Sequence, residues 1–186
     1  MLKKKINRWK MNPSFYSIYF VFLGYYFCMA VITLVTEINA PIERCFDLAR
    51  SIDLHSYSTA QTQEKAIAGV TSGLIQLNET VTWEAIHFGV RQRLTSRITQ
   101  MEFPVYFVDE QVKGIFRSIY HQHKFEEKEG KVWMTDIFEF KSPLGILGKI
   151  ANVLFLKKYL TRFILRRNNI IKHCAETELW KQFLAH

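Results

Sequence analysis

Cysteine is scarce in this sequence and is not arranged for cross-linking or metal binding. Cys28, Cys45 and Cys174 are far apart, no C-x-x-C pair occurs, and no histidine stands at zinc-ligand spacing from them. The cysteines therefore predict neither a disulfide framework nor a zinc site, and we expect buried thiols in a reducing, cytoplasmic compartment. We expect no metal and no cofactor.

Several motifs of common enzyme classes are missing as well. The chain contains no P-loop, no G-x-G-x-x-G, no G-x-S-x-G and no H-E-x-x-H. Phosphate chemistry, hydride transfer and zinc hydrolysis therefore have no local support.

Acidic residues are missing from two long stretches near the ends. Residues 1–28 carry five basic residues and residues 141–175 carry eight, whereas residues 29–140 hold 11 basic and 15 acidic ones. A nucleic-acid-binding domain would place its basic residues on a folded face, so we predict no nucleic-acid partner. An anionic membrane surface fits this distribution better.

Residues 1–28 form an extension to the domain predicted at 29–186. No charge lies between Lys10 and Glu37, which is typical of a membrane span behind a basic flank. The β-branched residues of 31–38 predict a strand instead, leaving only the aromatic-rich segment 14–28 for a bilayer. Two interpretations stay open: a membrane anchor, or an upstream extension of a chain that starts at Met29.

The body of the chain predicts an α+β domain with a seven-stranded curved antiparallel sheet. Pro41 and the apolar residues behind it predict a short helix over 41–50, and the polar stretch 51–63 is a loop with room for a second short helix. Besides the first strand, the expected strands are 66–76, 79–88, 92–101, 104–109, 112–125 and 131–140.

The last segment predicts one long helix from about Ser142 to Leu184. No proline or glycine follows Gly148. Its apolar stripe consists of Ile146, Ile150, Val153, Leu160, Ile164 and Ile171. Such a stripe needs an apolar partner, which the concave face of a curved sheet provides.

This order of elements resembles the helix-grip fold of the START-like or SRPBCC superfamily, which includes Bet v 1-like proteins, polyketide cyclases and lipid-transfer domains. Residues 37–47 are similar to the "APxExVF" opening of that superfamily, and residues 81–89, 121–125 and 136–145 resemble a bacterial ligand-binding subgroup. The resemblance covers about residues 30–180. It implies a cavity between sheet and helix that binds a hydrophobic small molecule or lipid, and it implies no shared reaction.

Strand parity predicts which side chains line that cavity. A tight hairpin at Glu129-Gly130 pairs His123 with Asp136, and a four-residue turn pairs His121 with Asp136. An imidazole lies beside the carboxylate in both registers. The predicted cavity residues are Trp83, His87, Arg117, His121, His123, Met134, Asp136, Phe138, Gly145 and Gly148.

Three functions are weighed for this cavity. His121, His123 and Asp136 are candidate catalytic residues for a cyclase or dehydratase-like enzyme, with a histidine as general base. No nucleophile or second acid stands beside them, so a buried structural hydrogen bond in a ligand-binding protein is favoured over an enzyme. The third interpretation is a membrane-tethered accessory protein whose cavity is filled by its own side chains.

The basic side of the long helix has two interpretations. Its residues are Lys157, Lys158, Arg162, Arg166 and Arg167. In the first, they form a solvated face. In the second, they dock on anionic lipid, and each residue near the surface contributes about 1 kcal/mol to the binding free energy.

Overall fold

The computed structural model describes residues 29–142 and 149–184, with side chains from residue 155 onward in the second range. The segments 1–28, Gly145 and Gly148 lie outside the described residues. The seven strands are β1 (Met29–Ile38), β2 (Lys65–Gly69), β3 (Thr80–His87), β4 (Val90–Glu102), β5 (Tyr106–Lys113), β6 (Ser118–Lys128) and β7 (Lys131–Lys141). The helical elements are α2 (Ile42–Ala49), α3 (Ile52–Ser58), η1 (Ala60–Thr62), α4 (Lys149–Glu176), η3 (Glu178–Trp180) and α5 (Lys181–Leu184).

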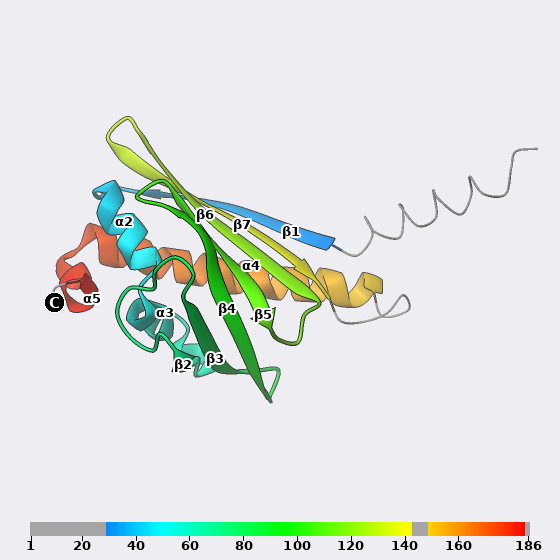
Figure 1. The fold of residues 1–186 in the computed structure, drawn as a ribbon. Helices are drawn as coiled ribbons and strands as arrows, with labels where there is room; N and C mark the ends of the chain where they lie inside the picture. Colours follow the sequence, from blue (N-terminus) through cyan, green and yellow to red (C-terminus); the bar gives the residue numbers. More distant parts are fainter. Residues whose placement is uncertain (1–28, 143–148, 185–186) are drawn as a thin grey trace, which may run out of the picture.

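All seven strands form one antiparallel sheet in the order β1-β7-β6-β5-β4-β3-β2. The sheet curves around α4, which runs along its inner face, while α2 and α3 lie near the C-terminal half of α4 (Figure 1). This is the helix-grip architecture that the resemblance predicted. It arises because the apolar side of α4 and the inner face of the sheet each bury the other.

The hairpin between β6 and β7 fixes the register of the sheet's centre. Lys128 pairs with Lys131, and the two turn residues, Glu129 and Gly130, have φ of 55° and 73°. Positive φ at both positions is typical of a tight two-residue hairpin whose twist matches the flanking strands. The resulting register pairs His123 with Asp136, which is the first of the two registers predicted.

Two strands differ from the sequence prediction at points where the backbone turns. β2 ends at Gly69, whose φ is +74°, instead of continuing to residue 76. The predicted strand 112–125 is divided, because β5 continues to Lys113 and residues 114–117 form a bend before β6. Arg117 therefore lies in this bend and is exposed, so the prediction that it shares the inner face of a strand was wrong.

The long helix ends earlier than expected and is followed by two short elements. At Thr177 the backbone is extended, and the threonine hydroxyl accepts a hydrogen bond from the Leu179 amide. This caps η3 and stops α4 at Glu176. Upstream, Ser51 caps α3 in the same way by accepting from the Leu54 amide, which makes a regular helix of a segment predicted mainly as loop.

The described part of α4 divides into a buried and an exposed side. Ile164 and Ile171 are buried against the sheet, as the stripe predicted, and Lys158, Arg162 and Arg166 are exposed. Arg167 is an exception, because its side chain is buried and was expected on the solvated face. Among the described residues, no helix is both long enough and apolar enough to cross a bilayer.

Candidate functional site

Four ionisable side chains meet on the inner face of three neighbouring strands. Asp109 on β5 pairs with His121 on β6, and His123 on β6 pairs with Asp136 on β7. Side chains two residues apart on one strand point to the same face, so both histidines lie beside both carboxylates. The two imidazole rings are 3.8 Å apart between centroids.

Asp136 contacts both histidines and does not itself line the cavity described below. Its Oδ1 accepts a hydrogen bond from His121 Nε2 at 2.8 Å and lies 2.9 Å from His123 Nδ1, although that second contact lacks hydrogen-bond geometry. Its Oδ2 accepts from Asn168 Nδ2 at 2.6 Å. The Asp136 side chain is fully buried, so these three groups replace the water that an exposed carboxylate would bind.

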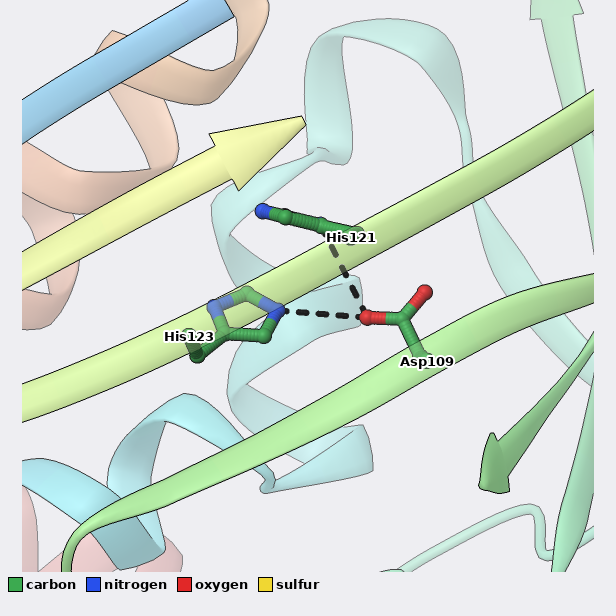
Figure 2. A group of neighbouring side chains, drawn as sticks. All are labelled: Asp109, His121 and His123. Carbon is green, nitrogen blue, oxygen red and sulfur yellow. Dashed lines mark hydrogen bonds and ion pairs between the residues drawn. The ribbon is translucent and has the colours of Figure 1, made fainter. Parts of the chain in front are cut away.

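Asp109 approaches the same histidines from the opposite side. Its Oδ2 lies 3.2 Å from His123 Nε2 and 3.6 Å from His121 Nδ1. Figure 2 shows this one carboxylate oxygen facing both rings. The Asp109 side chain is 24% exposed, whereas that of Asp136 is 1% exposed, so Asp109 is the carboxylate with access to the cavity.

Two consecutive residues of α4 complete the cluster. Asn168 donates to Asp136 and lies 3.3 Å from the hydroxyl of Thr36 on β1. Arg167 donates from Nη2 to the carbonyl oxygen of Ala49 at 2.6 Å, and its buried Nη1 has no hydrogen-bond partner among the described residues. Together they tie α4 to β1, β7 and α2 through buried polar contacts.

The carboxyl pKa values in the cluster are lowered. Burial alone would raise the pKa of Asp136, but the charge of His123 and the hydrogen bond from His121 hold it well below its usual range. Burial would also raise the pKa of Asp109, but the hydrogen bond with His123 and the charges of both histidines and Arg167 together outweigh it, so this pKa is lowered as well. Both carboxylates are therefore ionised at neutral pH.

The two histidines differ in their pKa values. Burial and the neighbouring charge of His123 lower the pKa of His121. For His123, burial is outweighed by the attraction of Asp136 and the hydrogen bond to Asp109, so its pKa is raised. His123 therefore holds a proton more readily than His121 does.

A cavity of about 160 Å³ opens beside this cluster, between the sheet and α4. Asp109, His121, His123 and Arg167 reach it from the cluster. Most of the remaining wall is apolar and includes Val81, Trp83, Leu94, Ile98, Phe107, Phe116, Ile119, Phe138, Leu160, Phe163 and Ile164.

A second polar group reaches the same cavity from β3 and the α3 region. His55 stacks on Trp83 with 4.1 Å between ring centroids, and its Nε2 lies 3.5 Å from Glu64 Oε1. His87 Nδ1 lies 2.7 Å from the Tyr159 hydroxyl on α4. Burial lowers the pKa of His87, which favours its neutral form.

The predicted cavity residues fall into four groups. Five line the cavity, namely Trp83, His87, His121, His123 and Phe138. Asp136 and Met134 are fully buried but do not line it, and Arg117 is exposed in a bend. Gly145 and Gly148 lie outside the described residues.

Sequence reasoning missed Asp109, Arg167 and Asn168. Asp109 was expected at the end of a strand, and only the pairing of β5 with β6 sets it opposite His121. Arg167 and Asn168 lie at helical spacing between Ile164 and Ile171, on the apolar side of the helix. Two polar residues at such positions were the sequence signal for a buried polar site. The expectation of no metal site rested on cysteine and histidine spacing along the chain, whereas Asp109, His121 and His123 bring potential ligand atoms within 4.8 Å of one another in the fold.

Solved structures with the same fold come from several sources. An aromatase/cyclase, Zhui, from Streptomyces sp. R1128 has a TM-score of 0.64 at 13% identity, covering 81% of this chain and 96% of its own. Major latex-like protein 151 from Panax ginseng has a TM-score of 0.59 at 14% identity, covering 81% and 99%. The di-domain aromatase/cyclase StfQ of the steffimycin biosynthetic pathway has a TM-score of 0.68 at 11% identity, covering 85% and 54%.

No protein-family model matches the sequence, and no curated protein matches it. The structural similarities confirm the helix-grip fold that the resemblance predicted. At identities of 11–14%, they say nothing of a shared reaction.

Proposed function

We propose that this protein binds a small, mostly apolar molecule carrying one polar group in the cavity between the sheet and α4. The observation that carries the proposal is the cavity's composition, since an apolar wall surrounds a few convergent charged groups. Ligand sites commonly combine an apolar lining with a small number of placed polar groups. Among the similar structures are a latex-like protein and two aromatase/cyclases, and this likeness supports a ligand-binding fold.

The size of the cavity limits the ligand. An engineered cavity of about 150 Å³ lined by apolar residues is known to hold benzene. The cavity of about 160 Å³ in this protein therefore fits a single ring or a short branched chain. A polar group on that ligand would meet Asp109 or the unpartnered Nη1 of Arg167.

The first experiment measures the binding of p-cresol and toluene, which differ by one hydroxyl, by isothermal titration calorimetry. We expect saturable binding of both, with p-cresol tighter because its hydroxyl pairs with the polar group. Ile164→Trp fills the cavity and abolishes binding, whereas Leu165→Trp, at an exposed position on the same helix, leaves it unchanged. Binding that survives Ile164→Trp would place the ligand elsewhere.

A second candidate function is proton transfer on such a ligand, as in a cyclase or dehydratase. The observation that favours it is His121, an imidazole that is hydrogen-bonded to Asp136 and lines the cavity, and whose pKa is lowered by burial. Under this alternative His121→Gln abolishes turnover and retains ligand binding. Under the carrier function the same change alters only affinity or stability.

Membrane delivery of the ligand is a further part of the proposal. Phe88 and Phe155 are more than half exposed and lie 5.5 Å apart between ring centroids, next to the exposed Lys157 and Lys158. Phe88 directly follows His87, which lines the cavity. Exposed aromatic residues beside basic ones suit the surface of an anionic bilayer.

A further inference from the structure

Asp109, His121 and His123 have the arrangement of a three-ligand metal site. The candidate ligand atoms are Asp109 Oδ2, His121 Nδ1 and His123 Nε2, which all lie within 4.8 Å of one another. The carboxylate oxygen lies 3.6 Å from the first nitrogen and 3.2 Å from the second. Zinc binds histidine at about 2.0–2.1 Å, and tetrahedral ligand atoms are then about 3.3–3.4 Å apart. The two oxygen–nitrogen distances are close to that spacing.

The ring nitrogen that each histidine would not use for the metal lies beside the same buried carboxylate, that of Asp136. His121 Nε2 donates to Asp136 Oδ1, and His123 Nδ1 lies 2.9 Å from the same oxygen. In metal sites, a ligating histidine almost always donates its other N–H to such a group, which fixes the tautomer and the ring orientation. Asp136 is in turn held by Asn168, so this carboxylate is already positioned as the hydrogen-bond partner of His121 and lies close to His123 Nδ1.

Metal binding would replace two contacts within the cluster. The Asp109 Oδ2 atom lies 3.6 Å from His121 Nδ1 and 3.2 Å from His123 Nε2. A metal ion between these atoms would accept a lone pair from each of them and would displace the proton that joins His123 and Asp109.

The surrounding charges also suit a divalent ion. Three carboxylates, those of Asp109, Asp136 and Glu64, act on the buried Arg167. Arg167 is itself positive and opposes a cation, but it neutralises only one of the three negative charges. With both histidines neutral, a divalent ion brings the sum of this group to zero.

We propose that Asp109, His121 and His123 bind a divalent transition metal ion, with zinc as the best fit, at the polar wall of the cavity. Two histidines and one carboxylate are ligands that zinc and other first-row metals accept. All three residues line the cavity, so the remaining coordination position opens into it. That position would hold water or a donor atom of the cavity's ligand. The metal site itself does not depend on the proposed ligand.

The test uses the full chain in a Cys28→Ser background, stripped with EDTA and titrated with Co²⁺ alone. We expect one equivalent of Co²⁺ to bind with the visible absorption of a four- or five-coordinate ion. Asp109→Asn and His123→Gln should abolish these bands, and Asp136→Asn should weaken binding about 10–100-fold as an outer partner. His173→Ala, at an exposed position on α4, is the matched control and should leave affinity unchanged.

Imidazole ¹⁵N spectra with Zn²⁺ give a second readout. We expect the Nδ1 resonance of His121 and the Nε2 resonance of His123 to shift on ligation, while the other nitrogen of each ring keeps its proton. Circular dichroism shows whether each variant is folded. Stoichiometry well below one, bands that survive in folded Asp109→Asn, or bands lost only with His55→Ala would overturn the proposal.

Discussion

Asn168 on α4 and Asp136 on β7 are joined by a 2.6 Å hydrogen bond between two fully buried side chains. The bond links α4 to the sheet next to the cluster of Asp109, His121, His123 and Asp136. It also determines how Asp136 presents its other oxygen to the two histidines, because a carboxylate held at Oδ2 cannot rotate freely.

Replacing Asn168 with alanine should destabilise the protein. The change leaves Asp136 Oδ2 buried without its donor, which costs about 1–3 kcal/mol in the free energy of unfolding. Asn169→Ala is the matched control, because that neighbouring side chain is exposed and its loss should cost less than about 0.5 kcal/mol. Urea denaturation measures both. Equal stability of the two variants would show that the buried bond contributes nothing.

Two glycines with nearly the same φ should respond differently to alanine. A Cβ at Gly69, with φ of +74°, would lie 2.1 Å from the carbonyl oxygen of Thr80, whereas at Gly130, with φ of +73°, it would meet nothing within 4 Å. Gly130→Ala should therefore cost only the left-handed backbone strain of about 1–2 kcal/mol. Gly69→Ala should cost clearly more, because strand β2 must move away from β3. Thermal unfolding of the two variants checks the order.

The Cys45 thiol should be unreactive in the native protein. Its side chain is fully buried, and burial raises the pKa of Cys45 to about 12. Because the thiolate is the reactive form, alkylation by iodoacetamide at pH 8 should require unfolding. Mass spectrometry of a Cys28→Ser, Cys174→Ser variant, with and without urea, measures this. Rapid labelling without urea would contradict the buried placement.

The full chain should bind anionic vesicles more strongly than neutral ones. Flotation with phosphatidylserine-containing and purely phosphatidylcholine liposomes measures the difference, and raised salt should weaken it. A Phe88→Ser, Phe155→Ser variant removes the two exposed rings and should bind less. A Val35→Ser control removes an apolar side chain that is 56% exposed on β1. Binding equal for both lipids would contradict the proposed basic and aromatic surface.

The alternation of apolar and polar residues, the turn residues and the apolar stripe of the helix were sufficient to predict the overall architecture. Alternation along 131–140 and the Glu129-Gly130 turn determined the β6–β7 hairpin, since side-chain period and turn geometry are local properties. The stripe through Ile164 and Ile171 likewise determined which side of α4 is buried. The strand ends at Gly69 and Lys113 were not determined in this way, because they depend on how the chain bends away from its partner strands.

The site was only partly determined by the sequence. Local pairing was enough to place an imidazole beside Asp136, because one short hairpin joins the two strands, but it left two registers open, of which the structure has the one with His123 opposite Asp136. Asp109 needed the pairing of β5 with β6 across an unpredicted bend, and Arg167 and Asn168 needed the packing of a helix against β1 and β7. Contacts of that kind join residues far apart in the chain, and the free energy that selects them is a property of the whole fold. The sequence thus determined that an imidazole lies beside Asp136, and tertiary structure alone selected the register and made the pair part of a cluster that faces a cavity.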